Sequence, residues 1–346
     1  MCNDASVIHI MLLSPDKQLY DVIHILPSFS STIPLYFFSI KIPNKMSNIN
    51  KLVFQFGDSL TAEQKNSFNQ HGVLQFKNFI NKATVADFLQ EIKNVENQLL
   101  QDNVQKVNGI PLKFGKNTDG QRFIQRIAFT SQYSKVLSDF LKDKRLALLA
   151  ELLYPYEGRV GENEKDGLVL NHYVNTPDSE YKQLGWHTDS PRDIFLGSKI
   201  MPMLNVGLHL DDYPFEKGGL RVLTGTHTQG LFKLLFRKKY FVDNDPDPKE
   251  TGFNIEAGDL TIHDGRLWHR VQRSVHFGDE SRRRVMYIPI VTGAYQPKHA
   301  NSPTPFYHKL ALPKLEQWRE NLRWAGVKRK DIVLNNAQLV TQADNL

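Results

Sequence analysis

The sequence predicts a mainly β, α+β fold, in which N-terminal helices precede an antiparallel barrel or double-sheet jelly roll and one helix follows it. Between about residues 167 and 293, short apolar or alternating runs recur, and Gly, Pro, Asn and Asp separate them. This pattern is typical of many short antiparallel strands. Before and after this region apolar residues recur every three or four positions, which favours helices.

The segment before residue 160 carries three helix signals. Thr61 and Gln64 form a capping box that predicts a short helix, and a strand is expected in the run "VLQFKNFI" that follows it. The run "NKATVADFLQEIKNVENQLLQ" has helical apolar spacing and predicts a long amphipathic helix. A third helix is expected over roughly Ser134 to Leu153, where Pro155 stops it.

Six runs in the central region predict core strands: "LVLNHYV", "MLNVGLHL", "GLRVLTGTH", "DLTIHDG", "WHRVQRS" and "RVMYIPIV". The pair Gly218-Gly219 and Gly225 lie among these runs, where glycines more often make hairpin turns than phosphate loops. Near the end of the chain, "LPKLEQWRENLRWAG" predicts a terminal helix.

We expect a single domain over residues 46–300, with a helical part at 46–160, a jelly-roll core at 167–293, and a helical extension at 301–346. Residues 1–45 are moderately apolar but interrupted by prolines, serines and lysines. They lack the unbroken apolar run of a transmembrane helix and the basic start of a signal peptide. We therefore expect a poorly ordered extension there, with translation beginning at Met46.

The composition favours a soluble protein of a reducing compartment, and we expect the cytoplasm. Cys2 is the single cysteine, so a disulfide within the chain and a thiolate metal cluster are excluded, and any metal must bind N and O atoms. The net charge of +6 is mild for 346 residues. The short basic runs 237–239 and 282–284 suit a solvated surface or an anionic substrate. Neither resembles a nucleic-acid-binding arm, and no oligomeric state is predicted.

Two His-x-Asp pairs are candidates for metal binding: His187 with Asp189 in "GWHTDSP", and His209 with Asp211 in "LHLDD". Residues two apart share a face of a strand, so either pair suits a β-barrel metal site. A non-haem Fe(II) oxygenase needs two imidazoles and one carboxylate, which leave three metal positions open.

Such a site also requires a second histidine several strands downstream, followed by a cation that holds a dicarboxylic cosubstrate. The segments "GDLTIHDGRLWHRVQRS" and "SRRRVMYIPIV" offer His269 and an arginine, Arg283 or Arg284. A guanidinium binds a carboxylate bidentately, which a lysine does less well.

Five segments stand in the order of one known family: "LTAEQKNSFNQHGVLQFKNFI", "GWHTD", "LDDYPFEKGGLRVLTGTH", "GDLTIHDGRLWH" and "RRRVMYIPI". With these motifs, over about residues 60–292, the chain resembles the phytanoyl-CoA dioxygenase-like branch of the Fe(II)/2-oxoglutarate oxygenases. The resemblance implies a double-stranded β-helix, the cupin-like jelly roll, and dependence on Fe(II), 2-oxoglutarate and O₂.

The resemblance also implies roles for the histidines. His187, Asp189 and His269 match the iron ligands of the family. The segment with His209 matches a strand and turn before the Gly-rich hairpin, so its His-x-Asp pair is expected to serve structure. His263 lies in the same segment as His269 and is the alternative third ligand.

In this family an inward-facing arginine stands at the head of the last barrel strand. Arg283 takes that place if Val285 and Tyr287 point inward, and Arg284 takes it if the register shifts by one. Further candidates for contact with 2-oxoglutarate or substrate are Asn171, Tyr173 and Thr188. For Asn171 and Tyr173, an ordinary barrel interior is an equal alternative. Trp186 and Trp268, each next to a ligand, are expected to pack around the imidazoles and exclude water.

These residues predict an Fe(II)- and 2-oxoglutarate-dependent dioxygenase that hydroxylates a small molecule and releases succinate and CO₂. The carboxylate of Asp189 stands where related halogenases have a small residue, which favours hydroxylation, although desaturation and ring closure use the same triad. The alternatives are a non-catalytic jelly-roll metabolite-binding protein and a zinc-dependent hydrolase.

The segment "LFKLLFRKKYFVDNDPDPKETGF" is a candidate lid, and Arg237, Lys238 and Lys239 in it suggest an anionic substrate. Neither a nucleic acid nor a membrane is an expected partner.

Overall fold

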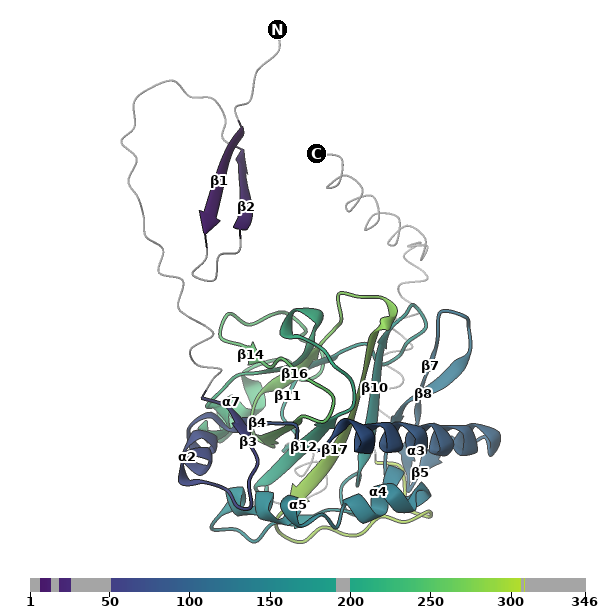
Figure 1. Cartoon of the computed structure of the whole chain (residues 1–346). Helices are drawn as coiled ribbons and strands as arrows, with labels where there is room; N and C mark the ends of the chain where they lie inside the picture. Colours follow the sequence, from purple (N-terminus) through teal and green to yellow (C-terminus); the bar gives the residue numbers. More distant parts are fainter. Residues whose placement is uncertain (1–6, 14–18, 26–50, 191–199, 306–307, 309–346) are drawn as a thin grey trace. The chain divides into compact units, whose positions relative to one another are not determined.

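Two β-sheets form the core of the chain between Val53 and Val291 (Figure 1). The structure, a computed structural model, describes residues 7–13, 19–25, 51–190, 200–305 and 308. The strands of the larger sheet are β3 Val53–Gln55, β4 Val73–Lys77, β7 Lys113–Lys116, β8 Arg122–Ile127, β9 Arg159–Val160, β10 Val169–Asn175, β12 Met203–His209, β15 Leu260–Asp264 and β17 Gly278–Val291. Their order is β3-β4-β15-β12-β17-β10-β8-β7, with β9 also paired to β17, and only the pairing of β3 with β4 is parallel.

The smaller sheet carries the order β11-β16-β13-β14. Its strands are β11 Leu184–His187, β13 Gly219–Val222, β14 Thr251–Gly252 and β16 His269–Gln272. Tyr173 of β10 and Val285 of β17 pack against Val271 of β16, so the two sheets face each other across a shared interior. This arrangement confirms the predicted jelly roll. A short hairpin, β5 Lys106–Val107 with β6 Ile110–Pro111, lies outside both sheets.

The larger sheet has one apolar face and one polar face because its side chains alternate. On β12, Leu204, Val206 and Leu208 are fully buried in the main hydrophobic core, together with residues of the helices. The alternate residues of the strand, among them Asn205 and His209, point to the opposite face, toward the smaller sheet. The polar side chains of this strand are thereby directed into the jelly roll.

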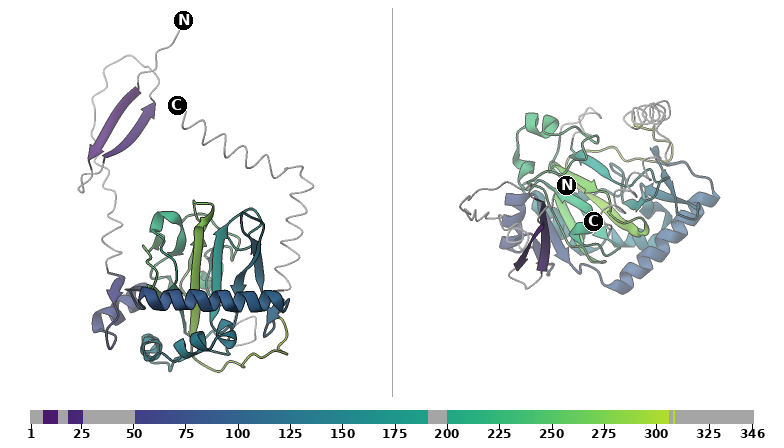
Figure 2. Two further views of the ribbon diagram at one scale, coloured as in Figure 1. Left: turned by 45° about the vertical axis from the view of Figure 1, so that its right-hand side comes forward. Right: turned by 90° about the horizontal axis from the view of Figure 1, so that it is seen from above.

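Helices cover the apolar face of the larger sheet. They are α2 Ala62–His71, α3 Lys82–Gln101, α4 Lys135–Phe140 and α5 Lys144–Leu149, while α7 Leu231–Phe236 lies in the connection between β13 and β14. Figure 2 shows α3 crossing the strands of the sheet. It buries Val85, Phe88, Ile92, Val95 and Leu99, each of which contributes roughly 1.5–3 kcal/mol of burial free energy.

The expected capping box is confirmed at the start of α2. The backbone N–H of Gln64 donates to the hydroxyl of Thr61 at 3.2 Å, and the backbone N–H of Thr61 donates to Gln64 Oε1 at 2.9 Å. The helix ends at Gly72, whose φ of 75° is a left-handed conformation that glycine adopts without strain. The next run forms β4, as expected, while the long helix over 81–101 is confirmed as α3.

The third expected helix, Ser134 to Leu153, is divided, which corrects the prediction. The structure has α4, then α5, and then a 3-10 turn, Ala150–Leu153. Asp143 breaks the run because its carboxylate accepts a hydrogen bond from the backbone N–H of Arg145 at 2.9 Å and so begins a new helix. Acidic side chains favour such caps over helix interiors, and apolar spacing alone does not reveal them.

The N-terminal part, expected to be helical apart from one strand, also supplies β3, β7 and β8 to the larger sheet. β7 and β8 form a hairpin around Asp119-Gly120, with Lys116 paired to Arg122. An Asp-Gly pair between alternating runs is a hairpin signal that the helical interpretation of this region overlooked.

The chain separates into two units, Met1–Pro43 and Asn44–Leu346. Within the segment expected to be a poorly ordered extension, β1 Val7–Leu13 pairs antiparallel with β2 Leu19–Ile25, so part of it has regular structure. The expected terminal helix lies outside the described residues, and the start at Met46 stays a prediction. Among the described residues, no helix has both the length and the apolar character that crossing a bilayer requires.

Candidate metal centre

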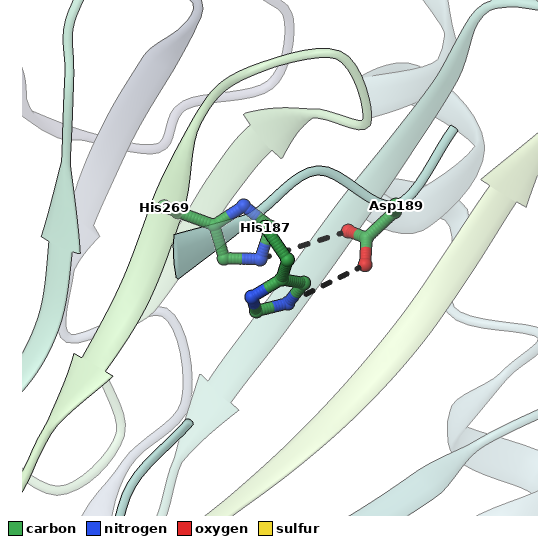
Figure 3. Close-up of side chains that lie close together, drawn as sticks. All are labelled: His187, Asp189 and His269. Atoms are coloured by element: carbon green, nitrogen blue, oxygen red, sulfur yellow. Dashed lines mark ion pairs between the residues drawn. The ribbon is translucent and has the colours of Figure 1, made fainter. Parts of the chain in front are cut away.

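The first His-x-Asp pair and the distal histidine come together inside the jelly roll (Figure 3). His187 is the last residue of β11 and lies directly opposite His269, the first residue of β16. Asp189 follows in the loop after β11. The Nε2 atoms of His187 and His269 each lie 3.9 Å from a carboxylate oxygen of Asp189. Among the described residues, these three form the one group of candidate metal ligands whose donor atoms lie within 4.8 Å of one another.

Backbone carbonyls fix the orientation of both imidazoles. Nδ1 of His187 lies 2.8 Å from the carbonyl oxygen of Gly185, and Nδ1 of His269 lies 2.9 Å from that of Leu267. Because a carbonyl oxygen only accepts hydrogen bonds, Nδ1 carries the proton in each ring and Nε2 keeps its lone pair. Each ring therefore turns a metal-binding nitrogen toward Asp189.

The carboxylate of Asp189 is held from two sides. Its backbone N–H donates to the carbonyl oxygen of Gly265 at 2.8 Å, which ties the loop to the turn between β15 and β16. Asn205 of β12 donates from Nδ2 to Asp189 Oδ2 at 3.0 Å. The sequence reasoning missed Asn205, although the two-residue period places it on the same inner face of β12 as His209.

Burial and charge together set the protonation of the group. Burial raises the pKa of Asp189, but His269, His263 and His187 lower it more, so that this pKa lies well below its usual range. Burial lowers the pKa of His187 and, more strongly, that of His269. At neutral pH the group is one carboxylate and two neutral imidazoles, the form in which these side chains bind a metal.

The donor set fits a divalent first-row metal ion. Such an ion binds imidazole nitrogen and carboxylate oxygen at about 2.0–2.2 Å, so ligand atoms about 4 Å apart can share it. Two imidazoles and one carboxylate form the facial set that leaves three positions open on non-haem Fe(II). His187, Asp189 and His269 would hold the ion.

A comparison with protein families decides the relationship. Residues 68–274, more than half of the chain, match the model of a family described as phytanoyl-CoA dioxygenase. The chain belongs to the phytanoyl-CoA dioxygenase family. This confirms the resemblance inferred from the five ordered motifs. The cofactors of the family, Fe(II) and 2-oxoglutarate, suit the donor set formed by His187, Asp189 and His269.

Solved structures offer further similarity. The 2-oxoglutarate-dependent epimerase SnoN from nogalamycin biosynthesis is 18% identical, with 67% of this chain and 84% of that chain covered and a TM-score of 0.49. HygX from Streptomyces hygroscopicus, solved with nickel and 2-oxoglutarate bound, is 17% identical, with 69% and 90% covered and a TM-score of 0.49. EvdO2 from Micromonospora carbonacea var. aurantiaca is 14% identical, with 72% and 99% covered and a TM-score of 0.48. Among curated proteins, no match was found.

In this member of the phytanoyl-CoA dioxygenase family, the strand register separates the two candidate arginines. Arg283 lies opposite Tyr173 on the inner face of β17, and its side chain is buried. Arg284 points the other way, where its Nε and Nη2 atoms donate to Asp211 at 3.0 and 2.5 Å. Arg283 is therefore the arginine inside the jelly roll, and Arg284 belongs to an ion pair outside it.

Arg283 lacks a full set of partners. Its Nη1 donates to the carbonyl oxygen of Gln272 at 2.9 Å, while Nε has no hydrogen-bond partner among the described residues. Burial lowers the pKa of the guanidinium, and the rings of Tyr173 and Tyr213 lie 5.6 and 5.8 Å from its Cζ. A buried cation with an unpaired N–H is costly unless an anion completes it.

The space beside Arg283 is small. The cavity there has a volume of about 10 Å³, enough for one water molecule. A dicarboxylate that pairs with this arginine therefore requires the tyrosines lining the cavity, among them Tyr173 and Tyr287, to turn aside. Burial raises the pKa of Tyr287 well above its usual value, and both Asp189 and Arg283 also affect it, so this ring lies within electrostatic range of both groups.

Asn171 and Tyr173 share the inner face of β10, as expected. Asn171 Nδ2 donates to the hydroxyl of Tyr173 at 3.4 Å, and Asn171 Oδ1 has no partner among the described residues. The ring of Tyr173 stacks on that of Tyr181 at 4.6 Å between centroids. Both positions thus face the interior near Arg283, and their contact with 2-oxoglutarate stays a prediction.

The second His-x-Asp pair has other contacts. Nδ1 of His209 is hydrogen-bonded to the hydroxyl of Tyr213 at 2.8 Å, and Nε2 of His209 to the hydroxyl of Thr261 at 2.9 Å. Burial lowers the pKa of His209 to about 3, so the ring is neutral. Because both ring nitrogens are engaged and Asp211 pairs with Arg284, this pair is held by structural contacts.

Two tryptophans join the metal strands to the segment 231–245. Trp186 and Trp268 are fully buried. Trp186 Nε1 donates to the carbonyl oxygen of Asp245 at 2.9 Å, and Trp268 Nε1 donates to that of Lys233 at 3.2 Å. The two tryptophans next to His187 and His269 therefore hydrogen-bond the candidate lid to β11 and β16. This contact adds to the packing around the imidazoles that was expected for the two indoles.

The same segment also contacts the metal loop. The hydroxyls of Thr188 and Tyr240 are hydrogen-bonded at 2.7 Å, and the ring of Phe241 stacks on that of His187 at 4.8 Å between centroids. Phe241 has a φ of 60°, a strained conformation for a residue with a side chain, and such strain is typical of functional sites. The sequence reasoning missed Tyr240 and Phe241, because nothing in the local pattern shows where the β13–β14 connection folds back. The expected contact of Thr188 with the cosubstrate stays a prediction.

Proposed function

We propose that the protein is an Fe(II)- and 2-oxoglutarate-dependent dioxygenase that hydroxylates a small molecule. One observation carries the proposal: inside the same jelly roll, a His-Asp-His donor group lies in the interior that also holds a buried, partly unpaired arginine. The first suits Fe(II), and the second suits the distal carboxylate of 2-oxoglutarate.

Each residue has a separate task in this proposal. His187, Asp189 and His269 hold the metal, and Arg283 binds the distal carboxylate of the cosubstrate. When bound, Fe(II) would supply O₂ activation, in which one oxygen atom oxidises 2-oxoglutarate to succinate and CO₂ and the other converts a substrate C–H into C–OH. The carboxylate of Asp189 would take a metal position that a halide needs, which favours hydroxylation over halogenation.

The candidate lid carries basic side chains that suit an anionic substrate. A cavity of about 760 Å³ is lined by residues of 235–245, including Arg237, Lys238 and Lys239. Lys238 is ion-paired with Asp247 at 2.9 Å, whereas no ion pair of Arg237 or Lys239 occurs among the described residues. Tyr240, which also lines the cavity, is hydrogen-bonded at 2.7 Å to Thr188 between the two metal ligands His187 and Asp189, and so connects the cavity to the metal site. We infer an anionic small-molecule substrate, met by Arg237 and Lys239.

The activity is tested by conversion of 2-oxoglutarate to succinate in air, with purified protein, Fe(II) and ascorbate. We expect slow succinate formation without substrate and faster formation with a substrate from a metabolite pool. His269→Ala should abolish both rates, because one of the two imidazole ligands is lost. A folded wild-type protein that forms no succinate with any pool, or that is active as a hydrolase with Zn²⁺, would contradict the proposal.

The substrate charge is tested by the variant Arg237→Gln/Lys239→Gln. We expect a weaker apparent affinity for the substrate found in that screen, with unchanged slow succinate formation in its absence, since the metal ligands are intact. Lys238→Gln is the matched control within the same basic run. Equal affinity in the double variant and the wild type would refute an anionic substrate at this cavity.

A further inference from the structure

A third histidine, His263, lies against the metal ligands. It belongs to β15, directly across from Asn205 of β12, and its side chain is fully buried. Neither of its ring nitrogens has a hydrogen-bond partner within 3.5 Å among the described residues. Buried imidazoles normally satisfy at least one nitrogen, so this ring is placed at a cost that the fold alone does not explain.

The nearest polar group to this ring is the carboxylate of Asp189. His263 Nε2 lies 3.6 Å from Asp189 Oδ2, and the His263 and His269 rings are 4.4 Å apart between centroids. Oδ2 is also the oxygen that accepts the hydrogen bond from Asn205 at 3.0 Å. Two neighbouring residues of the β12–β15 pair therefore converge on one oxygen of the ligand. Each oxygen also lies 3.9 Å from one imidazole ligand, Oδ1 from His187 Nε2 and Oδ2 from His269 Nε2.

We propose that His263 is a positioning residue for the metal ligand Asp189. In the metal-bound protein its Nε2–H would donate to Oδ2 alongside the amide of Asn205, so that the carboxylate would bind the metal through Oδ1 alone. A shift of about 0.5 Å in either side chain brings the 3.6 Å separation into hydrogen-bond range. The inference rests on the proposed function, since it concerns the ligand of the proposed iron.

The arrangement has a chemical consequence for the metal. Carboxylates bind metals through one oxygen or two, and a second oxygen would occupy a position that the cosubstrate or O₂ needs. Two donors on Oδ2 engage the lone pairs that such a second bond would use. His263 and Asn205 would thereby leave three metal positions open. His263 is not itself part of the donor group whose atoms lie within 4.8 Å.

The test compares His263→Leu, which removes the donor, with His263→Gln, which keeps an N–H donor on a side chain of similar length. The probe is Co²⁺ alone, whose visible absorption reports the number of ligands, with affinity measured by titration. For His263→Leu we expect about tenfold weaker Co²⁺ binding and an altered spectrum, because losing a partner of a metal ligand typically costs 10–100-fold in affinity. For His263→Gln we expect an affinity within about threefold of wild type and an unchanged spectrum.

Stability separates this role from a structural one. Because neither nitrogen of His263 is satisfied, His263→Leu should melt at the wild-type temperature or higher in the metal-free form. A structural role predicts a lower melting temperature and unchanged Co²⁺ affinity per folded molecule. If His263→Leu does not fold, His263→Phe and Asn205→Ala provide the same comparison, and Asn205→Ala should weaken Co²⁺ binding in the same direction.

Three outcomes would overturn the inference. Wild-type Co²⁺ affinity and spectrum in folded His263→Leu would show that the ring does not position Asp189. Equal Co²⁺ losses in His263→Leu and His263→Gln would show that donation from this position does not matter. Complete loss of Co²⁺ binding in both, as in His269→Ala, would make His263 a ligand. The proposed function is tested separately, by conversion of 2-oxoglutarate to succinate in the wild-type protein. If this conversion occurs, each of the three outcomes contradicts only the role of His263.

Discussion

Replacing Arg283 with methionine separates cosubstrate binding from folding. In the structure Nη1 of Arg283 donates to one backbone carbonyl oxygen and Nε donates to none among the described residues. A carboxylate on this guanidinium gains about two charge-assisted hydrogen bonds, each worth roughly 1.5 kcal/mol or more net of solvation. The loss of about 3 kcal/mol corresponds to about a hundredfold rise in the Kd for 2-oxoglutarate, at 1.4 kcal/mol per factor of ten.

The assay is calorimetric titration of 2-oxoglutarate into the Mn²⁺-loaded protein. Arg284→Met is the matched control, since Arg284 is the next residue of the same strand but is ion-paired with Asp211 on the other face. We expect its Kd for 2-oxoglutarate to stay within about twofold of wild type. Denaturant unfolding of the metal-free protein should show Arg283→Met to be at least as stable as wild type, because an incompletely paired buried charge is removed. An unchanged Kd in Arg283→Met, or an equal rise in Arg284→Met, would refute the assignment of the cosubstrate arginine.

Three further predictions concern His209, Trp186 and Asp143. His209 has a folded-state pKa of about 3 against 6.5 when unfolded, so the folded state binds fewer protons and stability falls as pH drops below 6.5. This group alone should cost about 2 kcal/mol of unfolding free energy between pH 7.5 and pH 5, and urea titrations should show a pH dependence smaller by that amount in His209→Gln than in wild type. Trp186→Phe deletes the hydrogen bond to the carbonyl oxygen of Asp245. Amide hydrogen exchange of residues 237–245 should then become roughly tenfold faster. Unchanged exchange rates would show that Trp186 does not hold this segment in place. Asp143→Ala removes the cap of α5 and should lower the unfolding free energy by about 1 kcal/mol in urea titrations, whereas no loss would mean that the capped start does not divide the two helices.

Much of the metal site could be predicted because its residues follow sequence rules. His187 and Asp189 stand two apart at a strand end, and His269 lies in a motif that follows in a fixed order. The inward orientation of Arg283 follows from the two-residue period of β17 once the neighbouring apolar residues are assigned to the interior. Those rules are local or depend only on order along the chain.

The parts that could not be predicted depend on contacts between distant segments. Asn205 and His263 meet at Asp189 only because β12 and β15 pair with these two residues opposite each other, and no local pattern fixes that register. Phe241 reaches His187 because the β13–β14 connection folds back over β11. Asp143 divides a helix by a side-chain hydrogen bond that competes with apolar spacing.

The most direct test of the central claim is the absorption spectrum of the protein with Fe(II) and 2-oxoglutarate in the absence of O₂. If His187, Asp189 and His269 hold Fe(II) and leave positions for the cosubstrate, a visible charge-transfer band should appear on addition of 2-oxoglutarate. The band should vanish in His187→Ala and persist in His209→Gln, which changes the histidine of the other His-x-Asp pair. A folded wild-type protein without the band, or a band that His187→Ala retains and His209→Gln loses, would contradict the assignment of this site.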